Sequence, residues 1–263
     1  MAVRIHPRAE VDTAADLGDG VEVGPFAVVE GGVRVGEGCR ILAGAHLRRG
    51  TTLGRENVVR DHAVLGGDPQ DLSYGGAETF LRVGDRNTFG EGCTLHRGSK
   101  AGGTTVIGND CFFMANTHAG HDSRVADHVI LANGALLGGH AQIGERAFLS
   151  GNAVVHQHCR VGRLVMLRGT GAASKDIPPF SVVSETNRLR GLNGIGLQRA
   201  GIGGEDLRAL RRAYRTLFAR PRNLRKAIAE VEAHGPLTAE VQELLDFIAA
   251  SERGVAGVPR RGE

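Results

Sequence analysis

The sequence contains no tryptophan and only two tyrosines and nine phenylalanines among its 263 residues. This scarcity excludes a core built mainly from large aromatic side chains. Chains that are poor in aromatics and rich in glycine, here 40 glycines, are often disordered. However, 41% of the residues are hydrophobic and they recur periodically, which argues for an ordered fold made from small and aliphatic side chains.

Several functional classes are also disfavoured by what is missing. No apolar run approaches the roughly 18 residues that a membrane span requires, and the N-terminal stretch MAVRIHPRAEV lacks the apolar core of a signal peptide. The four cysteines are scattered and form no CxxC pair, so we expect neither a zinc knuckle nor a disulfide framework, but reduced thiols in the cytoplasm. A formal charge of +3 does not by itself indicate nucleic-acid binding.

The dominant pattern is an aliphatic residue at every sixth position. This period matches neither an α-helix nor a simple strand, and it is typical of a parallel β-solenoid of short strands, with glycine, Asn or Asp at the corners. The pattern is interrupted at 66–82 and again near 99–105, where we expect loops. Before the first interruption the repeat comprises Ile5, Val11, Leu17, Val23, Val29, Val35, Ile41, Leu47, Leu53, Val59 and Leu65.

The repeat ends at the Ile-Pro-Pro segment 177–179, and the composition then changes. We therefore expect a β-solenoid over 1–185 and a helical domain over 186–263. Apolar residues at helical spacing predict helices at 206–220, 223–234 and 237–253, with Thr238 as the candidate N-cap of the last one.

Histidines are concentrated in one stretch, since six of the 11 lie between residues 114 and 159. If three six-residue units form one coil, residues 18 apart stack directly, about 4.8 Å from each other. Four histidines from three successive coils then fall on one corner, with His118 close by; they are His121, His140, His156 and His158. This cluster could hold a metal ion or form a structural ladder, but a general base is favoured because a neutral imidazole near pH 7 can accept a proton from a hydroxyl.

Several sequence blocks make a resemblance specific. They are HAGHD at 118–122, ILANGALLGGH at 130–140, VVHQHC at 154–159, PQDLSYGG, TLHRGS at 94–99 and GLNGIGLQRAG. With these blocks the chain closely resembles, over nearly its whole length, the bacterial UDP-N-acetylglucosamine O-acyltransferases that begin lipid A synthesis. The resemblance implies a homotrimer of left-handed parallel β-helices with active sites between subunits, and neither a cofactor nor a metal. It also implies transfer of an (R)-3-hydroxyacyl chain from acyl carrier protein to the 3-hydroxyl of UDP-N-acetylglucosamine.

The resemblance also assigns catalytic roles. His121 would be the general base, and the backbone N–H of Gly139 would stabilise the oxyanion. Asp122 would orient His121 or stabilise its charge, although adjacent side chains on a straight strand point apart.

Substrate contacts follow from the same resemblance. His118, His140, His156 and Gln157 would contact the sugar, the pyrophosphate or the acyl and pantetheine arm. The sugar would also meet Asp71, the nucleotide would meet Asn193 and Arg199, and Gly169 would leave room for a long acyl chain. From the residues alone, Asp71 could equally cap its own loop, and Asn193 could be a turn residue beside glycines.

The sequence departs from the family pattern at three positions. Ser73 stands where a lysine is usual, Ile195 where a glutamate is frequent and Arg168 where a small residue is common. These departures leave open whether the acceptor carries a 3-hydroxyl or a 3-amino group. A metalloenzyme of the hexapeptide carbonic anhydrase type and a non-catalytic relative that binds the same ligands are the alternatives from other classes.

Arginines follow helical spacing within 206–220. Arg208, Arg211, Arg212 and Arg215 are spaced i, i+3, i+4 and i+7, which places them on one helix face. This face is either ordinary solvated surface or, with Arg211, Arg212 and Arg215, a docking patch for the acidic acyl carrier protein.

Overall fold

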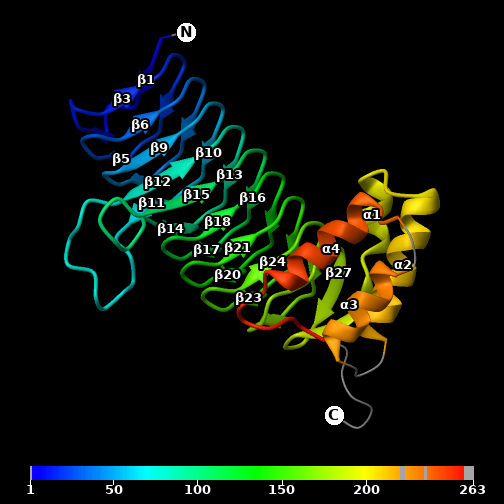
Figure 1. The fold of residues 1–263 in the computed structure, drawn as a ribbon. Coiled ribbons are helices and arrows are strands. Elements are labelled where there is room, and N and C mark those ends of the chain that lie inside the picture. The colour runs from blue at the N-terminus through cyan, green and yellow to red at the C-terminus, as the bar shows by residue number, and fades with distance from the viewer. Residues whose placement is uncertain (1, 220–222, 234–235, 258–263) are drawn as a thin grey trace.

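The computed structural model describes residues 2–219, 223–233 and 236–257. The chain winds as a parallel β-helix from the N-terminus, and a cluster of helices packs at the far end (Figure 1). Each complete coil gives one short strand to each of three sheets, so that three parallel sheets run along the solenoid. Strands that pair are separated by one coil of the chain, as in the pairing of His118 with Leu136 and of Leu136 with Val154.

The first sheet, sheet A, has eleven strands in the order β1 (Arg4–Ile5), β4 (Glu22–Val23), β7 (Arg40–Ile41), β10 (Val58–Val59), β13 (Thr88–Phe89), β16 (Phe112–Phe113), β19 (Ile130–Leu131), β22 (Phe148–Leu149), β25 (Met166–Leu167), β27 (Ser181–Ser184) and β28 (Arg188–Leu192). Sheet B has nine strands in the order β2 (Glu10–Val11), β5 (Val28–Val29), β8 (His46–Leu47), β11 (Val64–Gly67), β14 (Thr94–His96), β17 (His118–Ala119), β20 (Leu136–Leu137), β23 (Val154–Val155) and β26 (Ala172–Ala173). Sheet C has eight strands, in chain order β3 (Asp16–Leu17), β6 (Arg34–Val35), β9 (Thr51–Leu53), β12 (Phe80–Val83), β15 (Thr104–Ile107), β18 (Arg124–Val125), β21 (Gln142–Ile143) and β24 (Arg160–Val161).

The six-residue period has a direct structural cause. The periodic aliphatic side chain points inward and is fully buried in most coils, for example Leu47, Leu95 and Leu131. A residue with positive φ then turns the chain at the corner. From Asp110 to Thr170 such a residue recurs at every sixth position, and only one of these eleven residues is a glycine. The corners therefore impose a left-handed conformation on ordinary side chains, including three histidines of the histidine-rich stretch.

The first interruption of the repeat is a protruding connection. It spans 68–79, between β11 and β12, and is the large cyan loop of Figure 1. It is shorter than the predicted 66–82, because both of its ends are drawn into longer strands that pair with neighbouring coils. The buried Arg97 fastens this loop to the solenoid by donating hydrogen bonds to Asp68 and Thr79 of the loop and to Gly66 O of β11. The second connection, 97–103 between β14 and β15, lies within a residue or two of the predicted 99–105.

The C-terminal region begins with a hairpin that the sequence pattern did not predict. Strand β27 continues sheet A in parallel, and β28 pairs with β27 in the antiparallel direction. The predicted boundary between residues 185 and 186 falls inside this hairpin, so sheet A continues beyond it. The helices are α1 (Gly194–Arg199), α2 (Gly204–Phe218), α3 (Leu224–Glu232) and α4 (Ala239–Ala249).

The sequence pattern predicts α2, α3 and α4, but it does not predict the short helix α1. Thr238 occupies the predicted N-cap position of α4, although its side chain makes no capping hydrogen bond. The helix α4 packs on the end of the solenoid through an ion pair between Arg163 and Glu243, with nitrogen–oxygen distances of 2.8 and 3.0 Å. None of the described helices is long and apolar enough to cross a membrane.

Candidate active site

The candidate site lies where strand β17 ends and the chain turns toward β18. His121 is at this corner, and Asp122 follows it with φ of +58°. This left-handed backbone swings the Asp122 side chain back toward its neighbour, so that Asp122 Oδ2 lies 2.9 Å from His121 Nδ1. The expectation that adjacent side chains point apart holds for a straight strand but not at this corner.

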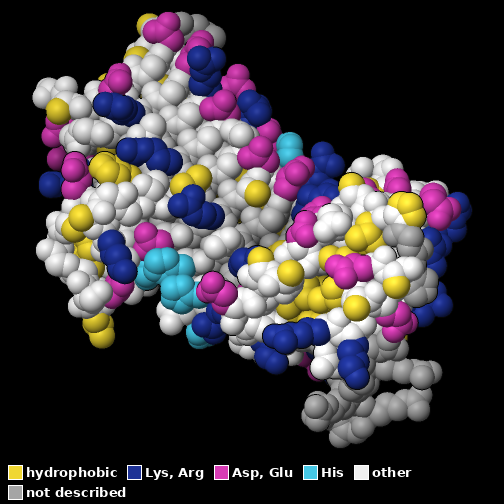
Figure 2. Space-filling model, in the orientation of Figure 1, with side chains coloured by type: hydrophobic (Ala, Val, Ile, Leu, Met, Phe, Trp, Pro, Cys, Tyr) yellow, Lys and Arg dark blue, Asp and Glu magenta, His cyan; other side chains and the backbone are white. Residues whose placement is uncertain are grey.

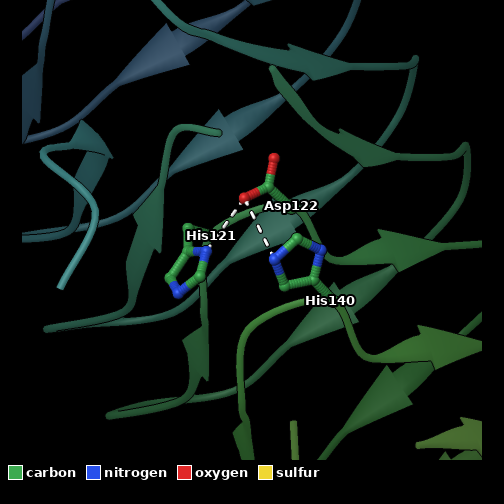
Figure 3. Close-up of side chains that lie close together, drawn as sticks. All are labelled: His121, Asp122 and His140. Carbon is green, nitrogen blue, oxygen red and sulfur yellow. Dashed lines mark hydrogen bonds and ion pairs between the residues drawn. The ribbon is translucent and has the colours of Figure 1, made fainter. Parts of the chain in front are cut away.

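His140 completes a three-residue cluster, shown in Figure 3. Its Nε2 lies 3.6 Å from Asp122 Oδ2, and its ring stands edge-on to that of His121, with 5.2 Å between ring centroids. His158 stacks on the other side of His140, with centroids 4.5 Å apart and an angle of 10° between the rings. Asp122, His140 and His158 come from three successive coils and form one column along the solenoid corner.

The second column at this corner contains His121, Gly139 and Gln157, again one from each of the three coils. A Cβ atom at position 139 would lie 2.5 Å from His121 Nε2, so this position has no room for a side chain. Gly139 is buried, and its N–H donates no hydrogen bond to any described residue. The equivalent N–H groups of neighbouring corners, such as those of Asn133 and Glu145, also lack an acceptor in the described chain, so what distinguishes Gly139 is its buried position beside His121.

Asp122 is held firmly as an anion. Burial would raise the pKa of its carboxyl, but the hydrogen bond with His121 and those donated by Ser99 outweigh burial and lower it below the usual value. Ser99 donates from its backbone N–H at 3.0 Å and from its Oγ at 2.7 Å, and Thr105 Oγ1 accepts from the Asp122 N–H at 2.8 Å. Ser99 and Thr105 were not singled out from the sequence.

Burial lowers the pKa of three histidines at and beside this cluster, His140, His118 and His96. Burial lowers the pKa of His140, and the nearby His158 and His121 add to that effect, against the opposing influence of Asp122. Burial likewise lowers the pKa of His118, whose Nδ1 lies 2.8 Å from Thr94 Oγ1. His96 packs edge-on against His118, and burial followed by the neighbouring histidines lowers its pKa to about 4.

His96 was missed because the regular spacing of one coil does not hold in this part of the chain. The connection 97–103 lengthens the coil, so Thr94 pairs with His118 at a spacing of 24 instead of 18. A count that allowed for the predicted loop at 99–105 would have placed His96 beside the cluster.

The other predicted site residues lie around or away from this centre. Asp71 is on the loop 68–79, where its Oδ1 accepts hydrogen bonds from the backbone and the hydroxyl of Ser73. These bonds lower the pKa of Asp71. Asp71 thus caps its own loop.

His156 and Gln157 are exposed at the same corner, and His156 Nδ1 lies 3.5 Å from an Arg253 guanidinium nitrogen. Gly169 is exposed, and a Cβ atom there would meet nothing closer than Gly151 O at 3.4 Å.

Asn193 is the N-cap of α1, and both ends of its amide are occupied, by Gly196 N–H and by Leu164 O. Within the described chain, neither Asn193 nor Arg199 forms a hydrogen bond or an ion pair with the histidine cluster. These two residues are therefore not brought to the site by one chain alone.

Arg211, Arg212 and Arg215 lie on α2. Glu205, just before the predicted basic run, pairs with Arg208 at 2.8 Å and with Arg212 at 3.3 Å. Arg211 and Arg215 have no carboxylate partner in the described part of the chain, so the basic face is partly neutralised on one side.

The three-residue cluster also has a spacing that could hold a metal ion, because one ligand atom from each of His121, Asp122 and His140 lies within 4.8 Å of the others. The same carboxylate oxygen already accepts two hydrogen bonds from Ser99. A histidine whose one nitrogen contacts a carboxylate, with its other nitrogen beside a glycine backbone, is an arrangement compatible with acyl transfer by general-base catalysis.

Comparison with known proteins agrees with this chemistry. Residues 104–139 match the bacterial transferase hexapeptide model, and residues 176–256 match domain 2 of the UDP N-acetylglucosamine O-acyltransferase family. The acyl-[acyl-carrier-protein]–UDP-N-acetylglucosamine O-acyltransferase of Syntrophobacter fumaroxidans is 38% identical over 96% of this chain and 99% of its own length. The enzyme of the same name from Stenotrophomonas maltophilia strain K279a is 40% identical over 96% of this chain and 97% of its own length.

Among solved structures, the UDP-N-acetylglucosamine acyltransferase from Campylobacter jejuni superposes with a TM-score of 0.91 at 32% identity and covers 98% of this chain and 100% of its own. The predicted left-handed parallel β-helix with C-terminal helices is thereby confirmed. The chain belongs to the family of acyl-[acyl-carrier-protein]–UDP-N-acetylglucosamine O-acyltransferases.

Proposed function

We propose that this protein transfers an (R)-3-hydroxyacyl chain from acyl carrier protein to the 3-hydroxyl of UDP-N-acetylglucosamine, the first step of lipid A synthesis, with His121 as the general base. The family membership supports the reaction. The single observation that supports the catalytic assignment is the contact of His121 Nδ1 with Asp122, which leaves His121 Nε2 beside the backbone of Gly139.

The proposed mechanism follows from the two nitrogens of His121. Nδ1–H donates to Asp122, so Nε2 carries the lone pair and takes the proton of the sugar hydroxyl as its oxygen attacks the thioester carbonyl. The negative charge that develops on the carbonyl oxygen is stabilised by the Gly139 N–H. When the tetrahedral intermediate collapses, the C–S bond breaks, and the imidazolium returns its proton to the departing thiolate of the pantetheine arm.

Asp122 stabilises the imidazolium that forms in this step, because its pKa is lowered and it stays ionised. His140 and His118 are kept neutral by burial, so they can hydrogen-bond to substrate without repelling the imidazolium. In this proposal His118, His140, His156 and Gln157 contact substrate around the base, and Asp71 reaches the sugar from the loop. The open space at Gly169 accommodates the end of the acyl chain.

A homotrimer is part of the proposal. Asn193 and Arg199 make no contact with the histidine cluster within one chain, so their proposed contact with the nucleotide requires a neighbouring subunit. Leu136 and Val154 pair in register on sheet B, and each is 41% exposed, which gives the solenoid an apolar strip beside the site. Subunit packing would cover this strip. The four free and buried cysteines support a reducing compartment, and we propose the cytoplasm.

The test is product analysis by mass spectrometry with a panel of 3-hydroxyacyl carrier proteins. We expect a UDP-linked 3-O-acyl sugar from the wild-type protein and essentially none from His121→Ala, whose trimer, measured by sedimentation, stays intact. His128→Ala is the matched control, because His128 also lies at a solenoid corner but outside the cluster. Full activity of His121→Ala would refute the base assignment. Product only with a 3-amino acceptor would mean that Ser73 and Ile195 mark a changed substrate.

A further inference from the structure

A large cavity of the described structure lies apart from the histidine site. It has a volume of about 810 Å³ and lies between the loop 68–79 and the solenoid surface at β6, β9 and β12. None of the clustered histidines lines it. A volume of this size is in the range of small-molecule and nucleotide sites. Figure 2 shows basic side chains spread over this part of the N-terminal half, above the histidine patch.

The cavity wall is rich in arginine. Five arginines line it against three carboxylates, which leaves a net charge of +2. The arginines are Arg34, Arg48, Arg49, Arg82 and Arg97, and the carboxylates are Glu30, Asp68 and Glu78.

Three of these arginines already have partners. The Arg97 side chain is only 6% exposed and its guanidinium donates to Asp68, Thr79 and two backbone carbonyls. Arg48 lies 3.4 Å and Arg49 3.8 Å from Glu30. These contacts hold the loop and the cavity floor together, so these three arginines serve the structure of the cavity.

Arg34 and Arg82 differ from the others. In the described chain neither forms an ion pair with a carboxylate. Arg82 donates only to uncharged oxygens, Gly50 O and Thr52 Oγ1 at 3.1 Å each and Leu81 O at 3.4 Å. Both arginines pair in register with Thr52, one from each side, so their side chains leave the same face of sheet C about 10 Å apart.

The positive charges of Arg34 and Arg82 repel each other. Burial lowers the pKa of Arg82, and the charge of Arg34 lowers it further. Two guanidinium groups that repel each other across one wall are stabilised by an anion between them. Thr52, placed between them in the ladder, offers a hydroxyl to the same anion.

We infer that this cavity is a second ligand site, which binds a soluble anion of nucleotide size carrying two linked phosphate groups, with Arg34 and Arg82 as its phosphate ligands. Planar guanidinium groups match phosphate oxygens with two parallel hydrogen bonds, which a single point charge cannot do. The inference goes beyond the proposed acyl transfer and does not depend on it.

The site is placed to influence the loop. Tyr74 and the segment 76–79 line the cavity from the loop, to which Asp71 also belongs. Phe80 lies under the Arg82 guanidinium, whose central carbon is 4.5 Å from the ring centroid. At Gly50 a Cβ atom would lie 2.5 Å from Thr79 O, so the returning end of the loop is pressed against the solenoid at the cavity edge. An anion that bridges the two walls would reduce the opening motions of the loop.

The test is calorimetric titration of the intact oligomer with inorganic pyrophosphate in the absence of UDP-N-acetylglucosamine, which itself carries two linked phosphates and would compete for the cavity. We expect one pyrophosphate per chain to bind at this cavity. Its affinity is expected to fall by at least about tenfold in the double variant that carries both Arg34→Gln and Arg82→Gln. The matched control is Arg124→Gln, because Arg124 is exposed on the same sheet and face but does not line the cavity. The control is expected to bind like the wild type.

Hydrogen exchange supplies a second readout. Pyrophosphate is expected to slow exchange of the backbone amides of 68–79 in the wild type and not in the double variant. Absence of binding, or equal binding by the wild type and a folded double variant, would overturn the inference.

Discussion

The substitution Asp122→Asn tests how the carboxylate beside His121 contributes to catalysis. The structure fixes the orientation of the new amide, because the backbone N–H of Ser99 donates to Oδ2 and requires an oxygen at that place. The amide oxygen then also faces His121 Nδ1, and the tautomer with the lone pair on Nε2 is retained. What the variant loses is the negative charge.

The expected magnitude follows from this single loss. A hydrogen bond to a charged group contributes about 1.5–3 kcal/mol and a neutral one about 0.5–1.5 kcal/mol. The difference, about 1 to 1.5 kcal/mol, is felt when the imidazolium forms in the transition state. It corresponds to a decrease in kcat of roughly 5- to 15-fold.

The assay is steady-state thiol release from 3-hydroxyacyl carrier protein in the presence of UDP-N-acetylglucosamine. Asp110→Asn is the matched control, because Asp110 is another corner carboxylate with φ of +56° and pairs only with Arg86. It is expected to keep wild-type kcat. A loss above about a thousandfold for Asp122→Asn would mean that the amide has turned and imposed the other tautomer, against the Ser99 argument. An unchanged kcat would mean that the contact between Asp122 and His121 has no catalytic role.

Two further predictions concern docking and pH. Replacing Arg211, Arg212 and Arg215 together by glutamate is expected to raise the KM for acyl carrier protein about tenfold and to weaken the salt dependence of that KM. The control Arg146→Glu, on the solenoid, is expected to change neither. An unchanged KM in the triple variant would mean that this face is ordinary surface. His96 has its pKa lowered to about 4. Because an unfolded histidine titrates near 6.5, the contribution of neutral His96 is complete above pH 6.5 and is lost as the pH falls toward 4. That loss amounts to about 3 kcal/mol in the free energy of unfolding. The variant His96→Gln is expected to lack this contribution, so its free energy of unfolding should fall less between pH 7.5 and pH 4.5 than that of the wild type.

Much of the fold could be predicted from the sequence, because every coil of a solenoid repeats the same local structure. Each six-residue unit places one aliphatic side chain inside, so a count of aliphatic residues predicts strands and sheets without knowledge of long-range contacts. The hairpin of β27 and β28 and the short helix α1 follow no such repeat. Both are held by contacts with the end of the solenoid, for example the hydrogen bond from Asn193 to Leu164 O, which sequence periodicity does not reveal.

The sequence predicted part of the candidate site, for the same reason. The spacing of one coil placed His140 and His158 in one stack, since that part of the chain has coils of uniform length. The contact between His121 and Asp122 was expected from the resemblance but not from strand geometry, because it depends on a left-handed corner. His96 and Ser99 were missed since the connection 97–103 lengthens its coil and shifts the register.

The two columns at the histidine corner explain why position 139 suits a glycine. The column of Asp122, His140 and His158 has left-handed φ at all three members, and the Asp122 side chain lies back against His121 of the neighbouring column. A Cβ atom at position 139 would lie 2.5 Å from His121 Nε2, the proposed base nitrogen, so the glycine leaves the imidazole its place. In the proposed mechanism the N–H of the same residue stabilises the oxyanion, so one residue meets two geometric requirements of acyl transfer.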